Sequence, residues 1–502
     1  MIVPPGRRRG YAADQHKTPW FLRSSAVHSF HAESPMRHTH DPIVLPTRRR
    51  FILTLGALGA AGTLGGLAPG ALAAATRARV AQGSNGKLQV GCVGCGGMGG
   101  SDLSNVAGHS AVKVTALCDV NRDTLRQSRA TYGVEESRCF TDYRAFLAAM
   151  GDIVDAVIVS TPDHAHAPVA VQAMRAGKGV YCQKPLTHSL HEARTMKEVA
   201  AQMKVATQMG IQNHAHKGRR LGMAWIESGV LGPVKAVHIW TNRPAGWWPQ
   251  GGPMKPGSDP VPADLDWESW INVAPMRPYL KDTYAPFRWR GVRDFGTGAL
   301  GDMACHFFDV PTKALALTAP VAVRGTVTDL TADQFPLSET VQLSFDGHAS
   351  SGGKPFDVWW YDGGRLPPAE ALPWVPKDFD MPTRSSDGAT IFVCELGTLV
   401  ICHPGEVHVF TAGAKPNFAP PELPDINHWH EWVDACMGKG ATRAGFEFSG
   451  PMTEIVLCGV VGGLVPDRTL RWDAKAMTWD DADAQKLVKP AYRGGWSVAG
   501  LG

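Results

Sequence analysis

The sequence predicts an α/β protein of two domains: a parallel sheet with helices on both faces, followed by an α+β domain around a mostly antiparallel sheet. Three observations carry this prediction. Short apolar runs alternate with helical patterns between residues 87 and 212, as in doubly wound sheets. A glycine-rich loop directly follows the first apolar run. Beyond residue 212, strand-like runs separated by turn residues replace this alternation.

Length and composition are those of a globular protein of more than one domain. The chain has 502 residues, 44% of them hydrophobic and 19% charged, which is enough for two sizeable cores. The formal net charge is +4, and arginine triplets at 7–9 and 48–50 account for much of the excess. The remainder is close to charge balance, so no nucleic-acid partner is expected.

The N-terminal region carries an export address. Residues 1–46 show no periodicity and are expected to be disordered or to precede the true start, with Met36 as an alternative start. Residues 47–75 combine an arginine pair, a moderately hydrophobic stretch and Ala71-Leu72-Ala73, as in a twin-arginine signal with its cleavage site. Pro69 and many glycines argue against a stable membrane span. We therefore expect export by the twin-arginine machinery to the periplasm or the extracellular space.

The elements of the first domain, residues 87–212, follow from its pattern. A capping box, Ser189 to Glu192, marks one helix start. Apolar runs predict strands at 88–93, 112–118, 154–160, 179–182 and 205–209, and helical patterns predict helices at 99–108, 122–132, 165–176 and 190–203.

The second domain, residues 213–482, begins with a helix expected at 217–227. Alternating apolar and polar residues then predict a half-exposed strand at 234–240, and a loop rich in Pro, Gly and Trp follows. We expect this domain to bind substrate and to form a homo-oligomer through its sheet, with residues 483–502 as a C-terminal tail. Further strands are expected at 340–345, 390–394, 398–402 and 407–410.

The glycine-rich loop predicts a dinucleotide site. It follows a strand and opens a helix, and Asp119 ends the next strand. Glycines allow a tight turn and close approach to a pyrophosphate, and the acid binds the ribose hydroxyls, as in a Rossmann NAD(P)-binding domain. A carboxylate disfavours a 2′-phosphate, so NAD is preferred, while nearby Arg122 leaves NADP open. The loop residues are Gly94, Gly96, Gly97, Met98 and Gly99.

Three later stretches indicate one chemistry. A loop containing Thr161 and Pro162 follows the third strand, and Gln183-Lys184-Pro185 follows the fourth. Asp302 and His306 are four residues apart, hence on one face of a helix.

These motifs, in this order, resemble those of the Gfo/Idh/MocA family, which includes glucose–fructose oxidoreductase and inositol dehydrogenase. The resemblance runs from about Lys87 to Asp481 and implies that Lys184, Asp302 and His306 are the catalytic trio. The family usually has Glu where this chain has Gln183, near the cofactor ribose, which bears on cofactor affinity and preference. The expected cofactor contacts also include Thr161, Pro162, His164, His166, Gln183, Lys184 and Gln212.

The trio suits oxidation of an alcohol. A neutral His306 accepts the hydroxyl proton while Lys184 hydrogen-bonds the oxygen. Asp302 binds a neighbouring hydroxyl or orients His306. His164 and His166 form either a wall of the nicotinamide pocket or loop anchors. Cysteine and histidine spacings show no convincing ligand set, so no metal is expected.

The substrate is expected to be a sugar or cyclic polyol. Indole rings suit the C–H faces of sugars, although they also anchor long loops. The candidate substrate contacts are Trp247, Trp248, Gln250, Arg288 and Trp289.

The predicted function is NAD(P)-dependent hydride transfer with a tightly held cofactor. Nicotinamide cofactors are essentially cytoplasmic, so an exported enzyme must return each hydride within the same site. One alternative is a redox-neutral glycosidase that acts by transient oxidation and elimination. A second is a non-catalytic sugar-binding protein of the same fold.

Overall fold

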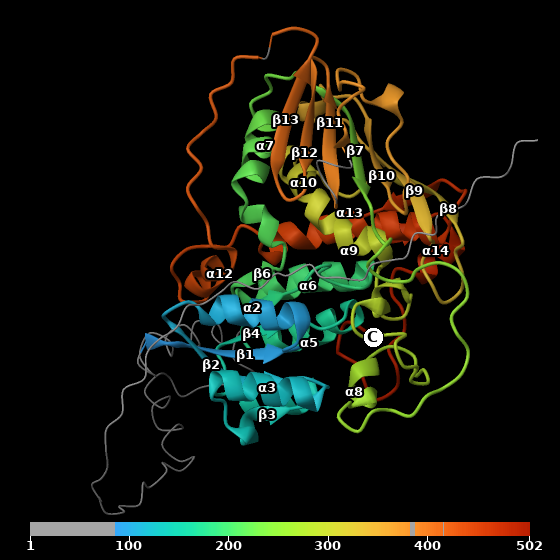
Figure 1. Cartoon of the computed structure of the whole chain (residues 1–502). Coiled ribbons are helices and arrows are strands. Elements are labelled where there is room, and N and C mark those ends of the chain that lie inside the picture. The colour runs from blue at the N-terminus through green and yellow to red at the C-terminus, as the bar shows by residue number, and fades with distance from the viewer. Residues whose placement is uncertain (1–85, 382–386, 415) are drawn as a thin grey trace, which may run out of the picture. The chain divides into compact units, whose positions relative to one another are not determined.

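The computed structural model describes residues 86–381, 387–414 and 416–502 (Figure 1). The predicted segments 1–46 and 47–75 lie outside the described residues. Within the described ranges, no helix has both the length and the apolar character needed to cross a membrane.

The first sheet has six parallel strands in the order β3-β2-β1-β4-β5-β6, which confirms the predicted doubly wound domain. Apolar side chains on both faces of the strands pack under helices, as buried parallel strands require. The strands are β1 Leu88–Val93, β2 Val112–Cys118, β3 Cys139–Phe140, β4 Ala156–Val159, β5 Gly179–Cys182 and β6 Thr207–Met209, and the helices are α2 Gly97–Ala107, α3 Arg122–Tyr132, α4 Tyr143–Met150, α5 His166–Arg175 and α6 Leu190–Met203.

The second sheet has nine strands in the order β13-β12-β11-β7-β10-β9-β8-β14-β15. It is antiparallel except between β10 and β7, which confirms the predicted mostly antiparallel sheet. The strands are β7 Val234–Thr241, β8 Ala322–Thr328, β9 Ser338–Phe345, β10 Phe356–Tyr361, β11 Gly388–Cys394, β12 Gly397–Cys402, β13 Glu406–Thr411, β14 Leu470–Asp473 and β15 Thr478–Trp479.

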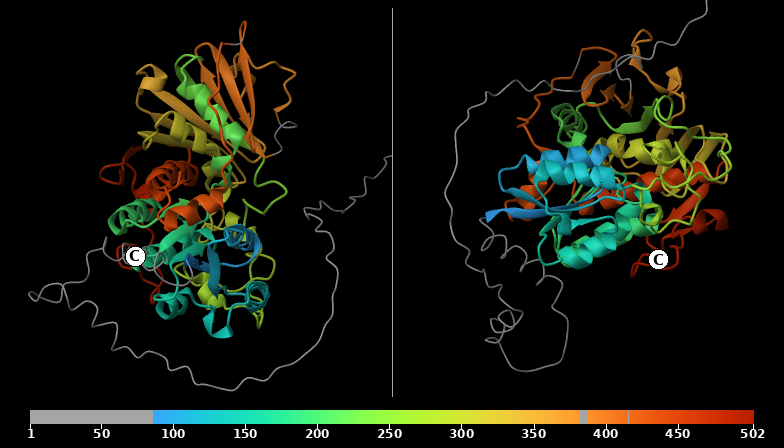
Figure 2. Two further views of the ribbon diagram at one scale, coloured as in Figure 1. Left: turned by 90° about the vertical axis from the view of Figure 1, so that its left-hand side faces the viewer. Right: turned by 60° about the horizontal axis from the view of Figure 1, so that its bottom comes forward.

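Helices cover one face of this sheet and join it to the first domain. Helix α7 packs on β12 and β13, as Figure 2 shows. Helix α13, almost wholly buried, packs on β8 and β9 and also on α6, so one apolar core runs from the first domain into the second (Figure 1). The helices of this part are α7 Lys217–Glu227, α8 Trp267–Ile271, α9 Gly298–Phe307, α10 Asp309–Ala314, α12 His428–Cys436, α13 Phe446–Leu464 and α14 Ala482–Lys486.

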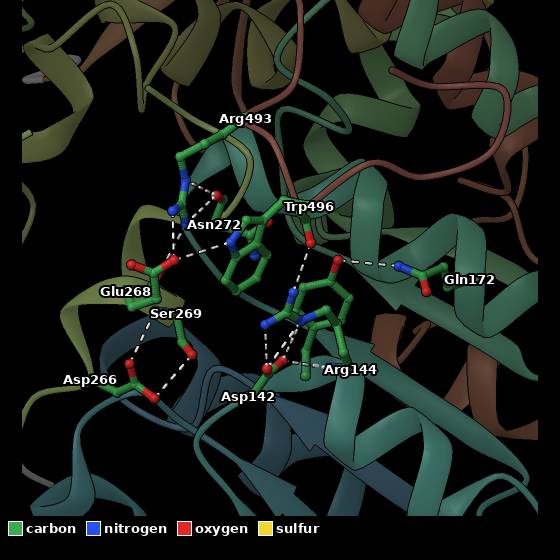
Figure 3. A network of polar contacts seen from close by, with 11 residues as sticks. Asp142, Arg144, Gln172, Asp266, Glu268, Ser269, Asn272, Arg493 and Trp496 are labelled. Atoms are coloured by element: carbon green, nitrogen blue, oxygen red, sulfur yellow. Dashed lines mark hydrogen bonds and ion pairs between the residues drawn. The ribbon is translucent and has the colours of Figure 1, made fainter. Parts of the chain in front are cut away.

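The C-terminal tail packs against the first domain. The Trp496 side chain is 3% exposed, and its ring centroid lies 3.7 Å from the guanidinium carbon of Arg144. Arg493 donates to the carboxylate of Glu268 (2.5 Å) and to the carbonyl of Asn272 (3.0 Å) (Figure 3). The tail therefore holds the α8 segment in place.

Candidate active site

A cleft of about 510 Å³ lies where strands of the first sheet end. This is the edge at which doubly wound sheets bind their ligands. The second half of the chain supplies the opposite wall, mainly from α8 and from residues 284–290. The predicted residues among those lining the cleft are Gly94, Gly96, Gly97, Met98, Gly99, Asp119, Thr161, Pro162, Gln183, Lys184 and Trp289.

The glycine loop is built for close backbone approach. Gly94 has φ of +86°, and a Cβ there would lie 2.4 Å from the carbonyl oxygen of Ser160. A Cβ on Gly99 would lie 2.1 Å from the carbonyl oxygen of Gly94. Both positions therefore exclude any side chain. Helix α2 begins at Gly97, so its unpaired N–H groups, which favour a pyrophosphate, border the cleft.

Asp119 is tied to this loop. Its Oδ2 accepts a hydrogen bond from the backbone N–H of Cys95 at 2.7 Å, and its Oδ1 accepts one from Asn121 at 2.9 Å. Burial raises the pKa of its carboxyl, and these hydrogen bonds oppose the rise. Arg122 is exposed at the start of α3 and is absent from the cleft lining, where Asn121 and Thr124 stand instead.

The two loop histidines act as anchors. His164 places its ring nitrogens 3.3 and 3.2 Å from the carbonyl oxygens of Phe295 and Trp270. His166 does the same with Pro185 and Thr161, at 2.8 and 2.7 Å. Burial lowers the pKa of His164 to about 3 and that of His166 to about 4. Neither ring lines the cleft, so of the two predicted roles the structure supports loop anchoring.

Lys184, which lines the cleft, meets Asp302 of α9. The Lys184 ammonium lies 2.7 Å from Asp302 Oδ1, and Arg290 Nε lies 2.9 Å from the same oxygen. Burial by itself raises the pKa of Asp302. The charges of Lys184, Arg290 and Arg243 outweigh burial and hold that carboxyl pKa well below its usual range. Asp302 is therefore an anion at any working pH and fixes the position of the lysine.

His306 lies one turn further along α9, also buried. Its Nδ1 has no hydrogen-bond partner among the described residues. Burial lowers the pKa of His306 well below its ordinary value, and the nearby Lys184 charge lowers it further. The predicted contact that would let Asp302 orient His306 is not found in the described part of the chain. Arg219 instead donates to the His306 backbone carbonyl and to Nδ1 of His403.

Gln183 faces a buried carboxylate. Its amide nitrogen donates to Asp102 Oδ2 at 2.8 Å, and Ser160 and Trp429 donate to the same side chain at 2.9 and 3.0 Å. A glutamate at 183 would place two carboxylates together. The amide that departs from the family pattern is therefore the partner that Asp102 requires.

The predicted substrate wall is only partly assembled. Trp248 and Gln250 are each 5% exposed, and the Trp248 indole N–H donates a hydrogen bond to Gln250 Oε1 at 2.9 Å. They therefore anchor the loop and do not form part of a substrate wall. Trp247 is 46% exposed and stacks on Arg243, while Trp289 alone of the set lines the cleft. Outside the lining lie Arg288, which is exposed, and Gln212, whose buried Oε1 has no partner in the described part of the chain.

Sequence reasoning missed Arg290, Arg243 and His403. The two arginines flank a loop without periodicity, and His403 comes from the turn between β12 and β13. The one available signal was Asp302 itself, because a buried carboxylate requires a cationic side chain nearby.

One group of possible metal ligands exists in the described chain. It contains Cys402, Glu406 and His408, whose ligand atoms lie within 4.8 Å of one another. None of the predicted site residues belongs to it.

Family models match both domains. Residues 88–211 match the Gfo/Idh/MocA oxidoreductase family model, described as an NAD-binding Rossmann fold. Residues 223–334 match the model of that family's C-terminal α/β domain. The first match also confirms the predicted cofactor class.

Curated relatives cover part of the chain. The levoglucosan dehydrogenase of Pseudarthrobacter phenanthrenivorans is 24% identical over 195 residues, which is 39% of this chain and 40% of that protein. The inositol 2-dehydrogenase of Salmonella typhimurium is 31% identical over 130 residues, which is 26% of this chain and 38% of that protein. The chain thus matches about two fifths of the length of these relatives.

Solved structures show the same fold. An inositol dehydrogenase homologue from Azotobacter vinelandii, complexed with NADH and myo-inositol, has a TM-score of 0.53 at 16% identity and covers 77% of this chain and 98% of that one. The WlbA dehydrogenase of Bordetella pertussis, in complex with NADH and UDP-GlcNAcA, has a TM-score of 0.53 at 17% identity, with 77% and 99% coverage.

Proposed function

We propose that this chain is a Gfo/Idh/MocA oxidoreductase, the family whose models match residues 88–211 and 223–334, and that it transfers a hydride between a sugar or cyclic polyol and a tightly held nicotinamide cofactor. One observation carries the proposal. Lys184 both lines the nucleotide cleft and hydrogen-bonds Asp302, one turn of helix from His306. The named curated relatives are dehydrogenases of a sugar derivative and of inositol, which favours this activity over the glycosidase.

The residues of the site divide the reaction between them. A nicotinamide held in the cleft would accept the hydride. Lys184, held by Asp302, donates a hydrogen bond to the substrate oxygen and stabilises the negative charge that develops there. His306 is neutral, and its Nδ1, which has no partner among the described residues, can accept the hydroxyl proton, so the alcohol becomes a carbonyl as hydride and proton depart.

NAD is the proposed cofactor in preference to NADP. The Asp119 carboxylate at the end of β2 would repel a 2′-phosphate. The exposed Arg122 side chain is not part of the cleft lining, which supports the same preference.

Export and retention of the cofactor belong to the same proposal. The twin-arginine pattern of residues 47–75 is the support for export, since that route carries folded proteins with their cofactor. Homo-oligomerisation through the second sheet remains a prediction.

The test uses the purified holoprotein. Absorbance of reduced nicotinamide should rise on adding a sugar or polyol and fall on adding a carbonyl acceptor. Lys184→Ala should abolish the rise while cofactor stays bound, and Lys354→Ala, at an exposed lysine, should not. Release of aglycone from aryl glycosides without net reduction would favour the glycosidase instead. A protein that binds neither NAD nor NADP would refute the proposal.

A further inference from the structure

We propose that the substrate is a sugar bearing a carboxylate, and that Arg243 and Arg290 bind that carboxylate beside the reacting hydroxyl. The inference rests on the proposed function and adds the substrate class.

Arg243 is a buried cation with little compensation. Arg243 comes shortly after the end of β7, and it is 8% exposed. The closest carboxylate oxygen, on Asp387, is 3.7 Å from its terminal nitrogen, and its buried Nε has no partner among the described residues. A guanidinium has five donors, and leaving them unpaired in a buried place is costly. Such an arrangement is expected where a ligand completes the pairing.

Arg290 presents the second guanidinium. Only its Nε is engaged in the described structure, by Asp302 at 2.9 Å, and its side chain lines the cleft. The guanidinium carbons of Arg290 and Arg243 each lie 5.8 Å from the same ring, that of Trp248. Both charges also act on the pKa of Asp302. The two guanidiniums therefore lie near one another and near Asp302.

Aromatic rings hold both guanidiniums in place. Arg243 lies 3.3 Å from the ring centroid of Trp247, and Arg290 lies 4.3 and 4.4 Å from those of Trp289 and Phe287. Stacked guanidiniums keep their edges free for in-plane hydrogen bonds. This geometry suits bidentate binding of a planar carboxylate.

The charge balance of the site favours a monoanion. Lys184, Arg243 and Arg290 are faced by the carboxylates of Asp302 and Asp387, which leaves one positive charge in excess. Arg219 is left out because the negative charge of Asp309 opposes its own.

The remaining titratable groups do not reverse this balance. Burial raises the pKa of Asp163 to about 7, so at neutral pH it supplies only part of a negative charge. Burial lowers the pKa of His403 to about 3, so it is neutral. A carboxylate, with one negative charge, matches the excess better than a phosphate dianion.

The experiment compares matched sugars on the holoprotein. Initial rates of cofactor reduction are measured with glucose, glucuronate, galacturonate and glucose 6-phosphate. We expect kcat/KM for a uronate to exceed that for glucose by about tenfold or more, the effect of one added charge-assisted hydrogen bond. Arg243→Gln should lower this ratio about tenfold, Arg243→Lys should lower it less, and Arg324→Gln, at an exposed arginine, should leave it unchanged.

Each outcome decides the point. Preference for glucose, preference for glucose 6-phosphate, or an unchanged ratio in Arg243→Gln would overturn the inference. Calorimetric titration of the holoprotein with glucuronate separates it from the proposed function. If the wild type binds glucuronate, Arg243→Gln does not, and no sugar reduces the cofactor, the carboxylate site is supported and the oxidoreductase activity is refuted. Turnover of neutral sugars with no glucuronate binding would do the reverse.

Discussion

Replacing Asp302 with asparagine tests whether one carboxylate holds the catalytic centre together. Asp302 Oδ1 receives hydrogen bonds from Lys184 (2.7 Å) and Arg290 (2.9 Å), and the three side chains are 5%, 12% and 14% exposed. Neutralising Asp302 leaves both cations buried without their anion. Breaking a buried pair in this way costs about 3–5 kcal/mol. That is a large part of the ~5–15 kcal/mol by which domains are stable.

The variant should also lose turnover. Lys184 is the donor aimed at the substrate oxygen, and without Asp302 its position is no longer fixed. Misplacing one such donor lowers kcat about 100-fold or more. Urea unfolding followed by tryptophan fluorescence gives the free energy of unfolding, and single-turnover reduction of bound cofactor gives the rate.

A matched control separates charge loss at this site from charge loss in general. Asp123→Asn removes a carboxylate that is 50% exposed and paired with Arg126, and should change stability by less than about 1 kcal/mol. If Asp302→Asn unfolded at the same urea concentration as the wild type and kept its turnover, the role assigned to Asp302 would be refuted.

Three further changes test other parts of the structure. Gly94→Ala should abolish cofactor binding in a thermal-shift assay, because its Cβ would lie 2.4 Å from the Ser160 carbonyl; normal NAD affinity would contradict this. Trp496→Ala should cost about 3 kcal/mol in urea unfolding and raise the Kd for NAD, because the tail braces α8. His428, whose pKa burial lowers to about 3, stays neutral when folded, whereas the unfolded chain takes up its proton below about pH 6.5. The free energy of unfolding therefore falls as the pH is lowered. In His428→Gln this pH dependence, measured between pH 6.5 and 4.5, should be weaker by at most about 1.4 kcal/mol per pH unit.

Most of the fold could be predicted because its strands are apolar runs of uninterrupted pattern. Strand β3, Cys139–Phe140, is too short to give a pattern, and β8, Ala322–Thr328, is interrupted by Gly325. A Cβ on Gly325 would lie 2.3 Å from the carbonyl oxygen of Gly462 in α13. Packing against α13 therefore requires glycine at this position, although glycine is a poor strand former. Helix α4, by contrast, carried a readable signal in Asp142, which caps it.

The site was predictable where residues follow strands or share a helix face. Lys184 and Asp302 meet as their motifs implied. Arg243 could not be placed, because it stands at the start of a long loop without periodicity. The role of His166 was equally open, since the sequence does not reveal which carbonyls meet a histidine ring.

The buried pair of Gln183 and Asp102 gives the sharpest test of why the sequence departs from the Gfo/Idh/MocA pattern at position 183. Asp102 is fully buried and accepts hydrogen bonds from four side chains: Ser160, Tyr181, Gln183 and Trp429. Burial raises the pKa of Asp102, and these donors oppose the rise. In Gln183→Glu, one donor becomes a second carboxylate about 2.8 Å away.

Two carboxylates at that separation must share a proton. The shared proton raises the pKa of the pair in the folded state above its unfolded value, so stability is kept at low pH and lost as the pH rises. A rise of about 2–3 pKa units corresponds to a loss of about 3–4 kcal/mol at pH 8 and little loss at pH 4.5.

The double variant Asp102→Asn, Gln183→Glu restores a donor and an acceptor. The asparagine amide can donate to the glutamate and to the Ser160 hydroxyl, while its oxygen still accepts from Tyr181 and Trp429. Urea unfolding at pH 8 should therefore show the double variant to be more stable than Gln183→Glu, with an interaction energy of about 2 kcal/mol or more. Equal stability of Gln183→Glu at both pH values, or no recovery in the double variant, would mean that Asp102 does not determine the residue at position 183.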